Sequence, residues 1–136
     1  MELQSPVNEI MTKEVVYAGL DNKFTQVMQL FLNYKMHHLP VVEDGYLKGI
    51  ISVNDILRCF AEYGSELDDV SDDSLNAKFK ITDFMTHDVV HIAPEAELRH
   101  VVDTFSQYDF QALPVVDLGK MVGIVTLKDI VKHLSN

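Results

Sequence analysis

The sequence contains few of the residues on which several common protein classes depend. It has one cysteine, Cys59, and no tryptophan among its 136 residues. A single thiol excludes a disulfide framework within the chain and is typical of a reducing compartment, so we expect a cytoplasmic protein. No apolar run approaches the roughly 20 residues that a membrane-spanning helix needs, and the first residues lack the basic and apolar regions of a secretory signal.

Basic residues are scarce as well. The chain has 11 lysines and arginines against 21 aspartates and glutamates, which gives a formal net charge of −10. Such a surface repels nucleic acid and anionic membranes, because both need a basic footprint on the protein. We therefore expect neither as a partner, and any phosphate group must be held by local donors rather than by the overall field.

The motifs of the common catalytic classes are also missing. There is no P-loop, no G-x-G-x-x-G, no nucleophile elbow and no pair of cysteines. Cys59 stands among apolar residues of an expected helix, which favours a buried, inert thiol. We therefore expect no enzymatic activity.

What the sequence does contain is an internal repeat. Residues 7–60 align without a gap with residues 81–134 at a constant offset of 74, and about 16 of the 54 aligned pairs are identical. The strongest match joins LPVVEDGYLKGIISVNDIL (39–57) to LPVVDLGKMVGIVTLKDIV (113–131). A duplicated unit predicts two equivalent sites related by an internal two-fold axis. We divide the chain into repeat 1 (1–60), an acidic linker (61–80) and repeat 2 (81–136).

Each repeat is predicted to run strand, helix, strand, strand, helix. In repeat 1, residues 14–18 favour a short strand, and apolar residues from Phe24 to Phe31 follow the spacing of an amphipathic helix. Asp44-Gly45 between two apolar runs predicts a tight hairpin, and Gly119 keeps the glycine in repeat 2. The linker stretch EYGSELDDVSDDS carries six acids and no base, which favours a solvated, mobile segment; a cation site or a docking strip for a basic partner is the alternative.

One motif stands out in both repeats. Residues 49–55 and 123–129 read G-h-h-[S/T]-x-x-D at the end of a strand and the start of a helix. The structural interpretation is a capping box, in which the hydroxyl and the acid satisfy exposed backbone amides. The functional interpretation uses the same geometry, because a helix N-terminus can hold a phosphate and a carboxylate can bind a ribose diol. The two interpretations are compatible.

The ordered set MT-x-x-VV, LPVV, hairpin glycine and G-h-h-[S/T]-x-x-D-I, present twice, resembles a tandem pair of CBS domains, the unit called a Bateman module. The resemblance covers nearly the whole chain. It implies an α+β fold of two β-α-β-β-α repeats packed about a pseudo-two-fold axis through their small sheets. It also implies clefts between the repeats that bind AMP, ADP or ATP as a regulatory ligand, with S-adenosylmethionine or NAD less favoured, and a homodimer that acts on an effector protein of unknown identity.

The resemblance assigns roles residue by residue. Asp55 and Asp129 would hold ribose. Phosphate would meet Ser52, Thr126, His37, His38 and Lys128. The base would lie against Val16, Tyr17, Ala18 and Ile50 in one cleft, and against Val90, His91, Ile92 and Ile124 in the other. No metal site and no further cofactor are implied.

The two repeats differ where a ligand would contact them. His37-His38 of repeat 1 aligns with Gln111-Ala112 of repeat 2, so repeat 1 is better equipped for phosphate. Lys128, whose counterpart is Asn54, compensates in part. A histidine metal site that adds His91 or His100 is disfavoured, because neighbouring residues of a strand point to opposite faces.

Two other functions remain open on the sequence alone. The first is a structural dimerisation module with vestigial clefts, in which the motif residues only cap helices. The second is a metal- or polyamine-responsive protein that uses the acidic linker.

Overall fold

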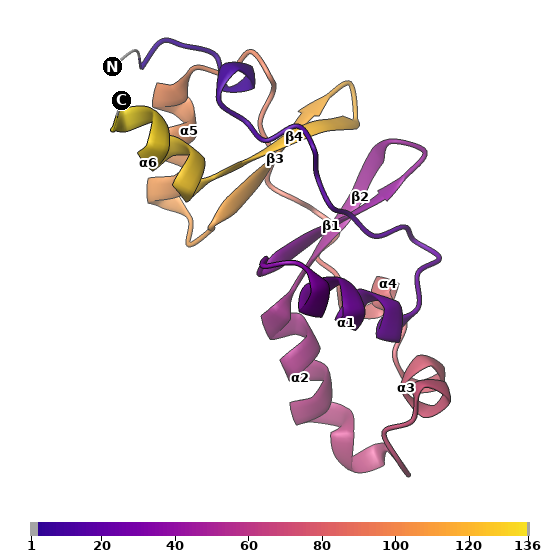
Figure 1. The fold of residues 1–136 in the computed structure, drawn as a ribbon. Helices are drawn as coiled ribbons and strands as arrows, with labels where there is room; N and C mark the ends of the chain where they lie inside the picture. The colour runs from indigo at the N-terminus through magenta and orange to yellow at the C-terminus, as the bar shows by residue number, and fades with distance from the viewer. Residues whose placement is uncertain (1–2, 136) are drawn as a thin grey trace. The chain divides into compact units, whose positions relative to one another are not determined.

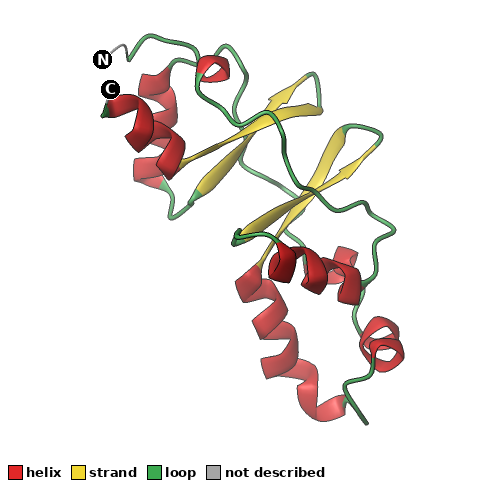
Figure 2. Cartoon of the chain, viewed as in Figure 1, coloured by secondary structure: helices red, strands yellow, loops and turns green. Residues whose placement is uncertain are grey.

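The computed structural model describes residues 3–135 and contains mixed helices and strands (Figures 1 and 2). The elements of repeat 1 are η1 (Val7–Glu9), α1 (Phe24–Asn33), β1 (His38–Glu43), β2 (Tyr46–Ser52) and α2 (Val53–Tyr63). Between the repeats lie η2 (Gly64–Glu66) and α3 (Asp72–Lys78). Repeat 2 supplies α4 (Ile81–Phe84), α5 (Leu98–Gln107), β3 (Ala112–Asp117), β4 (Lys120–Thr126) and α6 (Leu127–Leu134). The predicted mixed fold of two equivalent repeats is confirmed.

The chain divides into two compact units that do not coincide with the repeats. Unit 1 comprises the residues up to Val15, Gly45–Leu47 and the residues from Val90 onward. Unit 2 comprises Val16–Asp44 and Lys48–Val89. The first segment of each repeat therefore belongs to the unit that holds the hairpin of the other repeat. The division into 1–60, 61–80 and 81–136 describes the repeats along the sequence and stays a prediction.

The exchanged segments are held by backbone hydrogen bonds. In unit 1, the amide of Thr12 donates to the carbonyl oxygen of Ile124 at 2.8 Å, and the amide of Ile124 donates back at 2.9 Å. In unit 2, Ile50 and Thr86 exchange the same two bonds at 3.0 and 2.9 Å. Each Met-Thr segment thus pairs with a strand, β4 or β2, that leads into a copy of the helix-start motif.

Each unit has its own apolar core. The core of unit 2 includes Phe24 and Val27 of α1, Leu39 and Val41 of β1, and Ile51 of β2, all with no exposed surface. The core of unit 1 is built from buried apolar residues of repeat 2 together with Val7 of repeat 1. They are Val7, Ile92, Val101, Leu113, Val115, Val125 and Ile130. In each case the helices α1 and α2, or α5 and α6, lie beside the hairpin of the same repeat (Figure 1). The apolar periodicity read from the sequence accounts for these contacts.

In unit 1, β3 and β4 are antiparallel, with Ala112 opposite Thr126 and Asp117 opposite Lys120. The pair Tyr46 and Lys120, also within unit 1, links β2 to β4. The hairpin register places Ala112, the first residue of β3, opposite Thr126, the residue that caps α6.

The predicted first strand of each repeat is wrong in extent. Residues 13–17 form no strand, and Ala18 makes only an isolated parallel bridge to Val41, as Ile92 does to Val115. The bridge consists of the Ala18 amide donating to Pro40 at 2.9 Å and the Val42 amide donating to Ala18 at 2.8 Å. Residues 13–17 run between two isolated bridges, that of Thr12 to Ile124 and that of Ala18 to Val41, and form none of their own.

The linker is solvated along its acidic stretch, as expected, but it also contains η2 and α3. Ser71 caps α3 by accepting a hydrogen bond from the Ser74 amide at 3.2 Å. Leu75 and Phe79 are only 5% and 6% exposed and belong to the core of unit 2. Asn76 ties α3 to α1, since its side chain accepts from the Thr25 amide at 3.0 Å. The acidic side chains of the linker are exposed, while Leu75 and Phe79 pack into the core of unit 2.

The hairpin turns explain why glycine recurs in both repeats. Asp44 and Gly45 have φ angles of 53° and 86°, and Leu118 and Gly119 have 53° and 84°. Positive φ at both central residues is the type I′ turn, which suits aspartate and glycine but strains leucine. Leu118 is also 93% exposed, so no packing offsets that strain.

We expect Leu118→Asn to raise the free energy of unfolding by roughly 0.5–1 kcal/mol, because asparagine tolerates the left-handed region. Urea denaturation followed by circular dichroism would measure the change. Leu118→Ala controls for the removal of an exposed apolar side chain and should have little effect. Asp44→Leu, the matched change in the other hairpin, should lower stability; equal stability of Leu118→Asn and the parent would contradict the strain argument.

Candidate functional site

The helix-start motif forms a complete capping box in both repeats. At the start of α2, the Ser52 hydroxyl accepts from the Asp55 amide at 3.1 Å, and Oδ2 of Asp55 accepts from the Ser52 amide at 2.8 Å. At the start of α6, Thr126 and Asp129 make the same two bonds at 3.1 and 3.0 Å. The sequence spacing alone predicted this geometry, and the structural interpretation of the motif is confirmed.

A further amide at each helix start is also satisfied by the protein. The Val53 amide donates to the carbonyl oxygen of His37 at 3.0 Å, and the Leu127 amide donates to Gln111 at 3.2 Å. These bonds use amides on which the sequence argument for a phosphate site had relied. Phosphate binding at these positions would therefore depend mainly on side-chain donors.

In unit 2 the structure gathers several predicted site residues around Asp55. Asp55 is 8% exposed, and its Oδ1 accepts a hydrogen bond from Nη2 of Arg58 at 3.1 Å. His38 is half-buried at the start of β1, and burial lowers its pKa below 6.5; the neighbouring His37 lowers the pKa further, and Asp55 acts in the opposite direction. His37, His38, Asp55 and Arg58 thus form one mixed-charge group.

In unit 1 the equivalent acid has a different partner. The hydroxyl of Thr12 lies 3.3 Å from both Oδ1 and Oδ2 of Asp129 and donates to this carboxylate. Lys128 is exposed on the first turn of α6. Gln111 and Ala112 stand where repeat 1 has its histidines. The two acids therefore share a backbone setting but differ in the side chains around them.

The residues predicted to contact a base fall into two groups. Ala18 and Ile92 are core residues, 0% and 4% exposed, so their side chains face the interior of their units. The others remain partly or largely exposed: Val16, Tyr17, Ile50, Val90, His91 and Ile124. Ile50 and Ile124 are the residues whose backbones pair with the Met-Thr segments.

Two residues near the acids were missed from the sequence. Arg58 was not singled out, although its spacing of three from Asp55 on a helix predicts the contact. Thr12 was noted only as part of the repeat. Its contact with Asp129 could not be read from an alignment of the repeats, because it joins the start of repeat 1 to the end of repeat 2.

Groups of metal-ligating side chains and long apolar helices are both absent from the part of the chain that the structure describes. Among residues 3–135, no three His, Cys, Asp or Glu side chains are grouped so that they could hold a metal ion. Within the same range, every helix is too short or too polar to cross a bilayer.

Comparisons with known proteins agree with the fold and the repeat. Protein MJ1225 of Methanocaldococcus jannaschii is 29% identical over 98% of this chain and 44% of its own length, so this chain spans less than half of that relative. Its crystal structure superposes with a TM-score of 0.85 at 23% identity, covering 98% of this chain and 49% of that one. YhcV of Bacillus subtilis, a CBS domain-containing protein, is 28% identical over 97% of this chain and 88% of its own length.

A third comparison concerns a structure with bound ligands. The CBS domain pair of protein MJ0100, in complex with 5′-methylthioadenosine and S-adenosyl-L-methionine, superposes with a TM-score of 0.77 at 27% identity, and 96% of each chain is covered. The family model of the CBS domain matches residues 7–62 and 81–136, which are the two repeats found in the sequence. With both repeats matched over most of its length, this chain belongs to the CBS domain family as a pair of CBS domains.

Proposed function

We propose that this protein is a regulatory module that binds an adenosine-containing nucleotide of the AMP, ADP or ATP class. The observation that carries the proposal is the acid held rigidly at the start of α2, beside two histidines and an arginine. A fixed carboxylate suits the two hydroxyl groups of ribose, and the basic side chains suit phosphate. The ligands of the CBS domain pair of MJ0100, 5′-methylthioadenosine and S-adenosyl-L-methionine, support the adenosine part of this ligand and not its phosphate.

The stronger of the two proposed sites is the one around Asp55. Asp55 binds ribose, while His37, His38 and Ser52 contact phosphate. Arg58 is added to the sequence-based set: its side chain is 58% exposed, so it can turn from Asp55 toward a phosphate at little cost. Val16, Tyr17 and Ile50 offer side chains to the base, and buried Ala18 offers only its backbone.

The weaker proposed site is the one around Asp129. Thr126 and Lys128 supply the polar contacts to phosphate, and Val90, His91, Ile92 and Ile124 adjoin the base. A ribose that binds Asp129 must replace or share the hydroxyl of Thr12, which costs the existing hydrogen bonds. Fewer basic side chains and this competition both predict a lower affinity for nucleotide than at Asp55.

The side chains around Asp55 favour AMP, ADP and ATP over S-adenosylmethionine. Two imidazoles and a guanidinium attract phosphate, whereas the sulfonium of S-adenosylmethionine is a cation and gains nothing from them. We further propose that the bound nucleotide shifts a two-state equilibrium that an effector protein reads. The exposed Leu57 and Val131, which are equivalent residues of α2 and α6, fit a homodimer contact, and we assign the module no catalytic step.

The proposal is tested by thermal denaturation against AMP, ADP, ATP, S-adenosylmethionine and NAD. A ligand at about 100 times its dissociation constant should stabilise the protein by roughly 2.7 kcal/mol. The double variant Asp55→Ala/Asp129→Ala loses two capping boxes and will unfold at a lower temperature, so the measured quantity is its further shift on adding ligand. An equal ligand-induced shift in parent and variant, or no shift with any of the five ligands, would refute the proposal.

The capping boxes also favour the second candidate, a structural dimerisation module whose clefts bind nothing. Ser52, Asp55, Thr126 and Asp129 have complete structural roles without a ligand. This candidate predicts self-association with no ligand-induced shift, measured by sedimentation in the presence and absence of AMP.

A further inference from the structure

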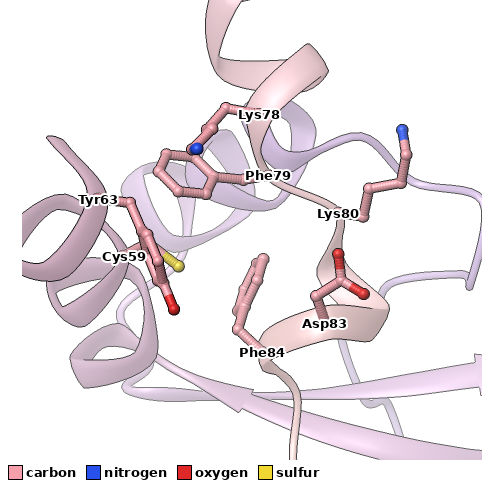
Figure 3. A pocket seen from close by; sticks show the side chains of 7 residues that line it. All are labelled: Cys59, Tyr63, Lys78, Phe79, Lys80, Asp83 and Phe84. Carbon is pink, nitrogen blue, oxygen red and sulfur yellow. The ribbon is translucent and has the colours of Figure 1, made fainter. Parts of the chain in front are cut away.

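Unit 2 contains a cavity of about 250 Å³ at the end of α2 that lies away from the helix-start motif (Figure 3). Seven residues line it: Cys59, Tyr63, Lys78, Phe79, Lys80, Asp83 and Phe84. None of them belongs to the sequence-predicted ribose, phosphate or base sites. Cys59 and Tyr63 come from α2, and the remaining residues come from the end of α3 through α4.

The interior of this α2–α4 cavity is aromatic. The rings of Phe79 and Phe84 lie 4.8 and 5.4 Å from the ring of Phe24, and Phe60 lies 6.0 Å from both Phe24 and Phe79. Figure 3 shows the ring of Phe84 directed into the cavity, with Tyr63 and the sulfur of Cys59 on one side. A planar ring in this space would join an existing aromatic cluster and meet ring edges and faces at favourable distances.

The rim of the cavity carries two lysines, Lys78 and Lys80, and one acid, Asp83. Lys78 is already occupied, since its Nζ lies 3.0 Å from Oε1 of Glu66 and 5.7 Å from the centre of the Tyr63 ring. Lys80 and Asp83 are exposed on the opposite wall (Figure 3), and neither takes part in an ion pair among residues 3–135. A carboxylate and an ammonium group on one small molecule would match this pair.

The size of the cavity sets the scale of the ligand. Its volume corresponds to about eight water molecules at roughly 30 Å³ each. Pockets for drug-sized ligands span about 300–1,000 Å³, so this cavity suits one ring with a short polar tail. A mononucleotide, with base, sugar and phosphate, exceeds it.

We propose that the α2–α4 cavity is a second ligand site, for an aromatic α-amino acid, with the ring against Phe79 and Phe84, the carboxylate on Lys80 and the ammonium on Asp83. Burial raises the pKa of the Cys59 thiol, so the sulfur is neutral and compatible with an apolar ring beside it. An occupant would touch the same helix whose first turn carries Asp55, at its other end. This site is independent of the proposed nucleotide site.

The test uses L-phenylalanine and two analogues that each lack one charge, 3-phenylpropionate and 2-phenylethylamine. Amide chemical shifts in two-dimensional NMR are followed as each probe is added to the full chain. A small ligand with one ring is expected to bind at about millimolar concentration. L-Phenylalanine should give saturable shifts at Phe79 and Phe84, and L-alanine, which has no ring, should give none.

Two charge variants make the test specific. Lys80→Gln should weaken L-phenylalanine and 3-phenylpropionate about threefold or more and leave 2-phenylethylamine unaffected. Asp83→Asn should weaken L-phenylalanine and 2-phenylethylamine and leave 3-phenylpropionate unaffected. Lys35→Gln and Asp21→Asn make the same charge changes on exposed residues of unit 2 outside the cavity and should leave all three affinities unchanged.

The outcomes separate cleanly. The site would be supported by saturable shifts, provided that Lys80→Gln weakens only the carboxylate analogue and Asp83→Asn weakens only the amine analogue. Absence of saturable shifts up to about 20 mM L-phenylalanine, or equal effects of the two variants on both analogues, would overturn it, since a millimolar ligand must saturate in that range. A parallel titration with AMP reports the nucleotide site, so failure of one proposal is not read as failure of the other.

Discussion

Gly123→Ala is expected to lower the free energy of unfolding by about 1–3 kcal/mol, because the added methyl group has no space. A Cβ atom at Gly123 would stand 2.6 Å from the sulfur of Met11 and 3.0 Å from the carbonyl oxygen of Thr12. The thioether can move, but the Thr12 carbonyl is fixed by its partner bonds to Ile124. The methyl group must therefore push the exchanged segment away from β4. Urea denaturation followed by circular dichroism measures the loss.

A matched control is available in the same chain. Gly64 follows α2 with a φ of −61°, and an added Cβ there meets nothing within 4 Å. Gly64→Ala should therefore be neutral or slightly stabilising, since it removes backbone freedom from the unfolded chain. Met11→Ala combined with Gly123→Ala should recover only the part of the loss that comes from the sulfur contact. Equal stabilities of Gly123→Ala and Gly64→Ala would contradict the close approach.

The same close approach occurs in unit 2. A Cβ at Gly49 would lie 2.7 Å from the sulfur of Met85 and 2.9 Å from the Thr86 carbonyl oxygen. The glycine that opens the helix-start motif is therefore explained by packing of the Met-Thr segment, without reference to a ligand. This packing also brings Thr12 to Asp129, so loosening it in Gly123→Ala should alter the surroundings of that acid.

The local parts of this fold could be predicted from the sequence because local chemistry determines them. The Asp44-Gly45 turn follows from the residues that accept positive φ, and the caps at Ser52 and Thr126 follow from the three-residue spacing to an acid. The hairpins and the two main helices of each repeat follow from apolar periodicity. These elements also position Asp55, so the core of the candidate site could be located in advance.

The exchange of segments between the repeats could not be predicted in this way. An alignment shows that Met11 and Met85 are equivalent, but not which glycine each of them covers. The same exchange brings Thr12 to Asp129. In the linker, the run of acids obscured Leu75 and Phe79, two apolar residues whose burial orders the segment.

Nucleotide affinity is expected to fall about tenfold or more between pH 6 and pH 8, because a phosphate must bind the protonated form of His38. In the free protein, burial and the neighbouring His37 keep the pKa of His38 below 6.5. An adjacent phosphate would raise that pKa, so binding takes up a proton. Affinity is then highest below the pKa of the free protein and falls as pH rises through the pKa of the complex. Calorimetric titration with AMP at several pH values measures this dependence.

The free protein should respond to pH in the opposite direction. Because its folded state holds His38 with a lowered pKa, the stability that neutral His38 contributes is present above about pH 6.5 and is lost as pH falls. Lowering the pH should therefore decrease the free energy of unfolding of the free protein while it increases nucleotide affinity. If acid simply disrupted the fold, the free energy of unfolding and the nucleotide affinity would both decrease.

Repeat 2 supplies the control residues for the pH experiment. His37→Gln and His38→Ala reproduce Gln111 and Ala112, which the fold already accommodates at the equivalent positions. The nucleotide phosphate itself titrates near pH 6, and the His38→Ala variant retains that contribution while lacking the imidazole. The parent should therefore show a steeper pH dependence than His38→Ala, with His37→Gln between them, since His37 lies nearby but is exposed. Identical pH profiles for the parent and His38→Ala would remove His38 from the phosphate site and leave Arg58 as its principal donor.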